Sequence, residues 1–378
     1  MKILHLISGG DTGGAKTHIY TLLKGLGERD GVSVSMACFR PGAFLDGAKA
    51  LGIDARLVEQ KNRFDMKALR HIADMIEEEG FDLVHCHGAR ANFNALYLRR
   101  RVDIPMVTTL HSDYLLDFKD NFIKDKIFTP LNRYALKRFP YYIAITERFK
   151  QMLIERGFPE DRIFVVYNGI NMRKEEPHIA KDALLERYGL GAYGDRMLFV
   201  TAARLDIVKD HRSLLKAIAL SKDELKGAHF LIAGEGADEA YLKSYVEEEG
   251  LEDLVSFLGQ VDDPFSVYYA SDVNVLTSVS ESFPYALLEG AKAKIPFIAT
   301  DVGGIREMAA DAGFVFKPRD VERLSELLVY SLNHPDEMKK RGEALYQFVD
   351  EHFSQVAMAK SHEAIYKSIL ERSKHDRS

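Results

Sequence analysis

The chain begins with the stretch Ile3-Leu4-His5-Leu6-Ile7-Ser8-Gly9-Gly10-Asp11-Thr12-Gly13-Gly14-Ala15, an apolar run followed by a glycine-rich turn. A helical segment follows. Glycines let backbone N–H groups approach an anion at the positively polarised N-terminus of such a helix. The spacing is neither the dinucleotide-binding G-x-G-x-x-G nor the P-loop G-x-x-x-x-G-K-[ST]. A strand, a turn and a helix are therefore expected, and a tight turn without a ligand is the alternative.

Short apolar runs alternate with longer amphipathic segments through the rest of the chain. In residues 64–79, for example, Met66, Leu69, Ile72 and Ile76 recur at helical spacing. This alternation predicts an α/β fold in which helices cover both faces of parallel sheets. The predicted strands are Ile3–Ile7, Val34–Phe39, Leu83–His87, Met106–Leu110, Tyr142–Ile145, Ile163–Tyr167, Met197–Ala202, Phe230–Ala233, Val255–Leu258, Val273–Leu276 and Phe297–Ala299.

The length of 378 residues favours two domains, because single cores usually stop growing below this size. Residues 171–177 are polar and lack apolar periodicity, which is typical of a linker. We expect one doubly wound domain over 1–172 and a second over 173–353, facing each other across a cleft. The helical segment 354–378 packs either on the second domain or back on the first. Ligands of such sheets bind beyond the carboxyl ends of the strands.

The composition is that of a globular protein, with 46% hydrophobic and 29% charged residues. The net charge of −6 gives no reason to expect nucleic-acid binding. The N-terminal apolar run is short for a signal peptide, and no run of about 18 apolar residues occurs. A cytoplasmic protein is expected, with peripheral attachment to the inner face of the membrane left open.

Two cysteines, Cys38 and Cys86, lie in predicted strands, which favours buried reduced thiols. His85 and His87 flank Cys86, but alternate strand residues point to opposite faces of a sheet. We therefore expect that this cluster does not converge on a metal. No cluster of carboxylates suited to a metal is evident either, and we expect neither a metal nor a cofactor.

Two cations, Arg204 and Lys209, follow the first strand of the second half and suit a diphosphate. Surface salt bridges are the alternative. Glu281 and Glu289 lie eight positions apart, in a loop and in the helix after it. Eight helical residues span about 12 Å, so the two carboxylates could bind separate parts of an extended ligand such as a nucleotide sugar. Otherwise, both are solvated surface residues.

A histidine, His111, follows a predicted strand and would point into the cleft, although a structural role is equally compatible with this position. Two more loops follow strands. One contains Asn168, and the other places Gly303 and Gly304 before a helix, where an anion is favoured.

The order and spacing of these motifs resemble the retaining glycosyltransferases of family 4, which have the GT-B fold of two Rossmann-like domains. The resemblance covers nearly the whole chain. The matching motifs are Gly13-Gly14-Ala15 with His18, the segment 82–88 with His85 and His87, His111, Asn168-Gly169, Arg204 with Lys209, Gly234-Glu235-Gly236, Glu281 with Phe283, Pro284 and Glu289, and Gly303-Gly304 with Glu307.

The resemblance implies a role for each matched residue. Arg204 and Lys209 would bind the donor diphosphate, together with the backbone amides of Gly13 and Gly14. The remaining donor contacts would come from Gly234, from Glu281 with Phe283 and Pro284 to the sugar, and from Glu289 to the ribose. His111 would lie near the anomeric carbon, and the acceptor side would include His18, His87 and Asn168. The family often has glycine where this chain has Ala203 and Asp210.

The implied reaction transfers a sugar from a nucleotide-diphosphate sugar, with UDP as the expected nucleotide, to an acceptor hydroxyl with retention of configuration. A bacterial surface polysaccharide or glycolipid is the expected product. A nucleotide-sugar epimerase and a non-catalytic hinged sugar-binding protein are the alternatives.

The segment 113–142 mixes apolar and basic side chains. One interpretation is a face that docks on an anionic membrane, and the other is a helix pair packed on its own sheet. The residues concerned are Leu115, Phe118, Phe122, Ile127, Phe128, Phe139, Tyr141, Lys119, Lys124, Lys126, Arg133, Lys137 and Arg138.

Overall fold

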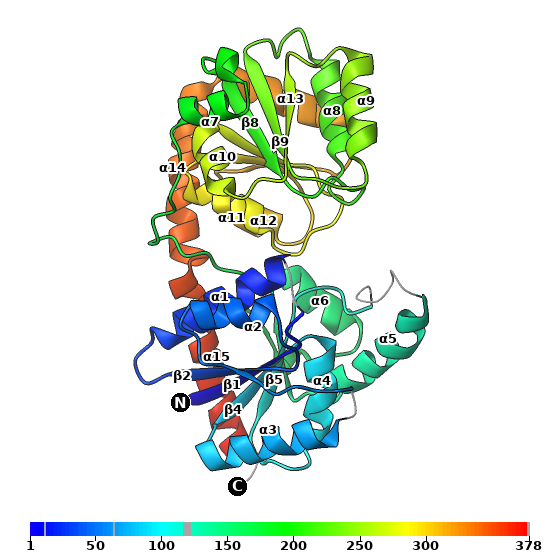
Figure 1. The fold of residues 1–378 in the computed structure, drawn as a ribbon, viewed down its shortest axis with the longest axis vertical. Coiled ribbons are helices and arrows are strands. Elements are labelled where there is room, and N and C mark those ends of the chain that lie inside the picture. The colour runs from blue at the N-terminus through cyan, green and yellow to red at the C-terminus, as the bar shows by residue number, and fades with distance from the viewer. Residues whose placement is uncertain (11–12, 63–64, 116–121, 376–378) are drawn as a thin grey trace. The chain divides into compact units, whose positions relative to one another are not determined.

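The computed structural model describes residues 1–10, 13–62, 65–115 and 122–375 (Figure 1). The chain divides into two compact units. Unit 1 comprises Met1–Asn171 and Gln355–Ser378, and unit 2 comprises Met172–Ser354. The C-terminal helix therefore belongs to the same unit as the N-terminus.

Unit 1 contains a seven-stranded parallel sheet in the order β3-β2-β1-β4-β5-β6-β7. Its strands are β1 (Lys2–Ile7), β2 (Ser33–Cys38), β3 (Ala55–Leu57), β4 (Leu83–His87), β5 (Met106–Leu110), β6 (Tyr141–Ala144) and β7 (Ile163–Val165). Its helices are α1 (Gly13–Gly27), α2 (Ala43–Ala50), α3 (Met66–Glu79), α4 (Gly88–Leu98), α5 (Phe122–Leu136), α6 (Glu147–Glu155) and α15 (Gln355–His375).

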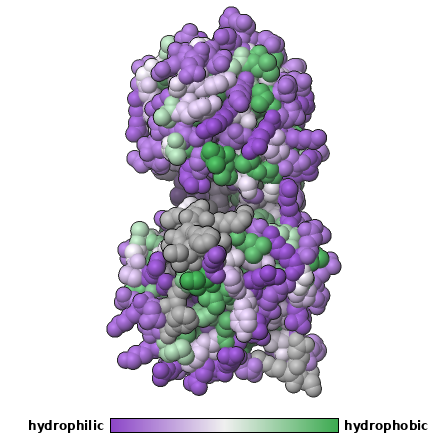
Figure 2. All heavy atoms as spheres, turned by 90° about the vertical axis from the view of Figure 1, so that its right-hand side faces the viewer, coloured by the Kyte–Doolittle hydropathy of each residue, from purple (hydrophilic) through white to green (hydrophobic). Residues whose placement is uncertain are grey.

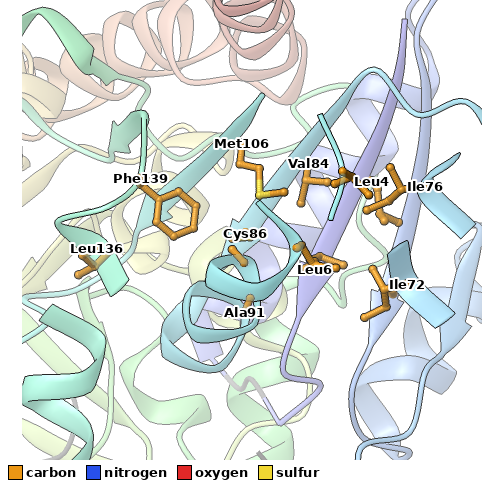
Figure 3. Close-up of a cluster of buried hydrophobic side chains, with 14 of the residues drawn as sticks. Leu4, Leu6, Ile72, Ile76, Val84, Cys86, Ala91, Met106, Leu136 and Phe139 are labelled. Atoms are coloured by element: carbon orange, nitrogen blue, oxygen red, sulfur yellow. The ribbon is translucent and has the colours of Figure 1, made fainter. Parts of the chain in front are cut away.

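Alternating strand residues divide the core of unit 1 between the two faces of its sheet. On one face, Leu4, Val84 and Cys86 pack under α3 and α4 (Figure 3). On the other face, Ile3 and Leu83 pack with α1 and α15. Complete burial of both faces explains why these strands are apolar runs.

Local signals fix the ends of the helix predicted around residues 64–79. The Asp65 carboxylate accepts from the backbone N–H groups of Lys67 and Ala68, and Gly80 ends α3 in the left-handed conformation at φ 64°. An N-cap of this type contributes about 1 kcal/mol. Glycine adopts the left-handed conformation without steric cost.

Unit 2 contains a six-stranded parallel sheet in the order β10-β9-β8-β11-β12-β13. Its strands are β8 (Met197–Ala202), β9 (Ala228–Ala233), β10 (Val255–Gly259), β11 (Val273–Leu276), β12 (Phe297–Thr300) and β13 (Phe314–Phe316). Its helices are α7 (Lys181–Arg187), α8 (His211–Leu220), α9 (Glu239–Glu249), α10 (Pro264–Ala270), α11 (Tyr285–Lys292), α12 (Ile305–Ala309), α13 (Val321–Asn333) and α14 (Pro335–His352).

The predicted α/β fold with two doubly wound sheets is confirmed, and both sheets reverse their strand order beside the first strand, as Rossmann-like sheets do. The edge strands β3 and β13, of three residues each, were not predicted. Of the two alternatives for the C-terminal segment, the structure has α15 packed in unit 1, where Met358 and Ile369 join Leu22 of α1.

No helix within the described ranges is long and apolar enough to cross a membrane. Figure 2 shows hydrophilic side chains over most of the visible surface, with the hydrophobic ones in small patches.

Candidate functional site

In unit 2, Lys209 and Glu281 come together from the loops after β8 and β11. Lys209 Nζ lies 2.6 Å from Glu281 Oε1, and the two side chains are only 19% and 10% exposed. Ser278 Oγ donates to the same carboxylate at 2.6 Å. The sequence predicted both residues as donor contacts but not their ion pair. A phosphate bound at Lys209 would compete with Glu281 for the ammonium group.

Arg204 lies on the same loop but is far more exposed than Lys209. Its Nη2 atom is 3.1 Å from Asp206 Oδ2, and its side chain is 76% exposed. An exposed ion pair of this type contributes little to stability. The guanidinium is therefore available to an anionic ligand at low cost.

The loop that carries these cations is tied to its neighbours by backbone contacts. Val279 N donates to Val208 O at 2.8 Å, and Leu205 N donates to Glu235 O at 2.9 Å. A Cβ atom at Gly234 would collide with the carbonyl oxygen of Ala203, so only glycine fits there. The structure thus gives Gly234 a packing role beside the cation loop.

The departure from glycine at Asp210 has a local explanation. Asp210 adopts the left-handed conformation at φ 49°, which glycine enters freely and aspartate tolerates better than most residues. Its Oδ2 atom accepts from Ser213 Oγ at 2.7 Å. The carboxylate is therefore engaged at the first turn of α8.

The loop that contains Glu281 packs against Gly303 and Gly304. Gly304 N donates to Ser282 O at 2.8 Å, and a Cβ atom at Gly303 would collide with the carbonyl oxygens of Glu281 and Ser282. Phe283 is buried against Phe353, with ring centroids 5.0 Å apart. Pro284 then occupies the N-cap position of α11. Gly303 and Gly304 therefore fix the conformation of the loop that contains Glu281. The sequence did not predict this packing role for the two glycines.

Glu289 lies on α11, where its side chain is partly buried beside Tyr268 and Tyr285. Burial raises the pKa of its carboxyl from 4.5 to about 7. The charge of Glu289 thus changes near neutral pH. A ligand hydroxyl that donates a hydrogen bond to the ionised carboxylate would stabilise that form and lower the pKa of Glu289.

In unit 1, a pocket opens beyond the carboxyl ends of β1, β4 and β5. It has a volume of about 320 Å³, and its lining includes Ser8, Gly88, Arg90, His111 and Asn132. This is the edge of a parallel sheet at which ligands bind. His111 follows β5 and lines this pocket, as expected for a residue just beyond a parallel strand. Gly13 and Gly14 form the first turn of α1, whereas Asp11 and Thr12 are outside the described residues.

A histidine cluster lies behind this pocket, on the sheet face covered by α1 and α15. His87 contacts His111 through Nδ1 and Nε2 at 3.1 Å, and His5 through Nε2 and Nδ1 at 3.0 Å. Burial lowers the pKa of each member of the cluster, so all are neutral at pH 7. Its members are His5, His18, His85, His87, His111 and His362.

The expectation that histidines around Cys86 do not converge was wrong for the histidines. Alternation sends Cys86 to the α3–α4 side, but His85 and His87 are two residues apart and share a face. They meet His5 there, with one nitrogen of each within 4.8 Å of the others. The same holds for His18, His87 and His111.

All three acceptor-side residues implied by the resemblance belong to this neighbourhood, namely His18, His87 and Asn168. His18 Nδ1 lies 2.8 Å from Asn168 Oδ1, and His18 and His111 have ring centroids 4.6 Å apart. Sequence reasoning missed His5 and His362. His5 lies two residues after Ile3 on the same strand, so alternation predicts that both face α1 and α15. His362 joins the cluster through α15, whose packing the sequence did not determine.

The basic and apolar residues of segment 113–142 divide between core and surface. Phe139 and Tyr141 are buried, whereas Ile127 is 50% and Tyr134 is 49% exposed. Lys137 Nζ donates to the carbonyls of Arg156 and Gly157 at 2.7 and 2.8 Å, so it is part of the fold. Phe118, Lys119 and the side chains of Phe122 and Lys124 are outside the described residues.

Comparison with known proteins relates both units to glycosyltransferases. The family model of Glycosyltransferase Family 4 matches residues 12–174, and that of Glycosyl transferases group 1 matches residues 185–348. N-acetyl-alpha-D-glucosaminyl L-malate synthase of Bacillus anthracis is 25% identical over 82% of this chain and 81% of its own length. The UDP-Gal:alpha-D-GlcNAc-diphosphoundecaprenol alpha-1,3-galactosyltransferase of Escherichia coli is 26% identical over 70% of each chain.

Among solved structures, Anabaena Alr3699/HepE in complex with UDP superimposes with a TM-score of 0.81 at 20% identity, over 97% of this chain and 100% of that one. This likeness concerns the fold. Together with the two family matches, it identifies the chain as a glycosyltransferase that belongs to family 4, group 1 type, and has the GT-B fold.

Proposed function

We propose that this glycosyltransferase moves a sugar from a UDP-sugar to an acceptor hydroxyl with retention of anomeric configuration, in the synthesis of a bacterial surface polysaccharide or glycolipid. The observation that carries the proposal is the grouping of Arg204, Lys209 and Glu281 on two adjoining loops of unit 2. The names of relatives support the choice of donor, since one takes UDP-galactose and a lipid-linked acceptor. Solved complexes of HepE contain UDP and UDP-glucose.

The chemical demand of this reaction is the charge that develops on the leaving diphosphate. Arg204 and Lys209 supply two positive charges, so the diphosphate needs no metal ion. Removing one preorganised donor of this kind costs about 3–4 kcal/mol of transition-state stabilisation. Glu281 would release Lys209 to the phosphate and accept hydrogen bonds from the sugar.

Retention requires that the new bond forms on the face from which the old one leaves. The C1–O bond to the diphosphate breaks while the acceptor oxygen bonds to C1, and the acceptor proton passes to a phosphate oxygen of the leaving UDP. His111 orients groups near C1 rather than taking that proton. A His111→Ala enzyme with full activity and unchanged donor affinity would remove His111 from this scheme.

The donor proposal is tested by titrating the full chain with UDP and a panel of UDP-sugars in a calorimeter. Lys209→Met should weaken binding of UDP by at least tenfold, because it removes the buried ammonium. Lys226→Met is the matched control, since Lys226 is 76% exposed in a surface pair with Asp223. Equal binding by both variants would contradict the proposal. NMR of the transfer product shows whether the anomeric configuration is retained.

We also propose that unit 1 attaches peripherally to the inner face of the membrane through α5, in a cytoplasmic enzyme. Ile127 and Tyr134 offer exposed apolar surface, and the Arg138 guanidinium carbon lies 3.4 Å from the Tyr134 ring centroid. Arg133→Glu with Arg138→Glu should abolish sedimentation with anionic vesicles, whereas the control Lys243→Glu in unit 2 should not. Wild-type protein that stays in the supernatant would end this idea.

A further inference from the structure

We propose that His18, His87 and His111 form a binding site in unit 1 for one divalent transition-metal ion of the zinc class. One nitrogen from each of the three lies within 4.8 Å of the others. His87 Nδ1 and His111 Nε2 are 3.1 Å apart. Nitrogens that share a tetrahedral zinc ion at about 2.0–2.1 Å lie about 3.3 Å from each other, so small ring rotations complete the site.

The hydrogen bond at His18 prepares one ligand. An amide oxygen only accepts, so the contact of 2.8 Å with Asn168 Oδ1 places the proton of His18 on Nδ1. The lone pair is then on Nε2, which is buried and has no hydrogen-bond partner within the described part of the chain. A buried polar atom without a partner commonly indicates a missing water or ion. Asn168 is the kind of outer partner that orients metal-binding histidines.

His87 has an equivalent outer partner. When Nδ1 of His87 binds a metal, the proton must lie on Nε2, and His5 Nδ1 is 3.0 Å away to accept it. Two of the three ligands are thus held by second hydrogen bonds of the correct direction.

The alternative histidine trio fits a metal less well. His5, His85 and His87 also have nitrogens within 4.8 Å. However, His85 Nδ1 contacts the Tyr366 hydroxyl at 2.6 Å and His85 Nε2 contacts Thr109 Oγ1 at 2.7 Å, so both of its nitrogens are engaged. The trio with His18 also has access, because His111 lines the pocket of about 320 Å³.

The ligand set defines the class of metal. In the described residues, the group consists of imidazoles alone, which suit zinc, cobalt, nickel and copper rather than magnesium or calcium. Three protein ligands leave one tetrahedral position open towards the pocket. Water, or an oxygen of a molecule in the pocket, would occupy it. All three ligands belong to unit 1.

The test is a cobalt titration of the full, tag-free chain after treatment with a chelator. We expect one Co²⁺ per chain, with the strong visible absorption of tetrahedral cobalt, and displacement by Zn²⁺. His111→Gln and His18→Gln should each abolish this absorption, and Asn168→Ala should weaken affinity about 10- to 100-fold. His71→Gln, on the exposed side of α3, is the matched control and should bind like the wild type.

Circular dichroism of each metal-free variant shows whether it is folded. His111 is only partly buried, so its variant keeps the test valid if His18→Gln does not fold. Two results would overturn the proposal. One is no stoichiometric binding of Co²⁺ or Zn²⁺, which would leave a chain of hydrogen-bonded histidines. The other is undiminished tetrahedral absorption in the folded His111→Gln protein.

Discussion

Replacing Glu289 with glutamine should stabilise unit 2 at pH 8 and weaken donor binding at the same time. The carboxyl of Glu289 has its pKa raised by burial from 4.5 to about 7. The folded protein thus binds this proton more tightly than the unfolded chain does. Stability is therefore unaffected below about pH 4.5, falls as the pH rises to 7, and stays lower above it. Glutamine, which is always neutral, avoids that loss.

The size of the effect follows from the two pKa values. The difference between 4.5 and about 7 corresponds to at most about 3.4 kcal/mol, since one pKa unit equals about 1.36 kcal/mol. Partial solvent contact of the side chain screens the charge, so we expect about 2 kcal/mol. For a unit of this size, that corresponds to an increase in Tm of about 4–8 °C.

Differential scanning calorimetry at pH 5 and pH 8, without nucleotide, measures this effect. The variant should exceed the wild type in Tm only at pH 8. Glu247→Gln on the exposed side of α9 is the control and should change Tm at neither pH. In the same buffers, wild-type affinity for UDP should rise through pH 7, whereas that of Glu289→Gln should be lower and constant. A Tm difference that is equal at both pH values would refute the reasoning.

Three further predictions concern single contacts. Arg204→Ala should lower kcat/KM for transfer about 100- to 1,000-fold with no change in Tm, because its side chain is 76% exposed. Gly303→Ala should destabilise unit 2 by about 2 kcal/mol, since φ is 58° and the new methyl group meets two carbonyls. Urea unfolding and UDP titration should both detect this change. Tyr366→Phe should cost unit 1 about 1–2 kcal/mol in calorimetry through its lost bond to His85, with UDP affinity unchanged.

The sequence predicted the fold well because its strands are buried on both faces. Runs such as Leu83–His87 and Met197–Ala202 coincide with β4 and β8. The three-residue strands β3 and β13 were missed, since such short segments show no period. The equally short β7 was predicted because it begins the longer apolar run Ile163–Tyr167. The position of α15 also could not be read, because a loose apolar stripe fits more than one surface.

The candidate site was only partly predictable. Motif order pointed to Lys209 and Glu281 separately, but their ion pair joins loops 72 residues apart in the chain. The histidine cluster illustrates the same difficulty. Alternation along one strand separates Cys86 from its two neighbours, but it does not show that His87 meets histidines on β1 and α1 or that His85 meets His362 on α15. The sheet order, with β1 beside β4, places His5 next to His85 and His87, and the packing of α1 and α15 adds His18 and His362.

The return of α15 to unit 1 has a consequence for biosynthesis. Gln355 N donates to Ile170 O at 2.8 Å, so the segment that leaves unit 1 and the segment that re-enters it are hydrogen-bonded to each other. During translation, all of Met172–Ser354 is therefore synthesised before α15 exists. Only then can Tyr366 bond to His85 and complete the core of unit 1. The same adjacency makes Met172–Ser354 an insertion whose two ends meet at one place in unit 1.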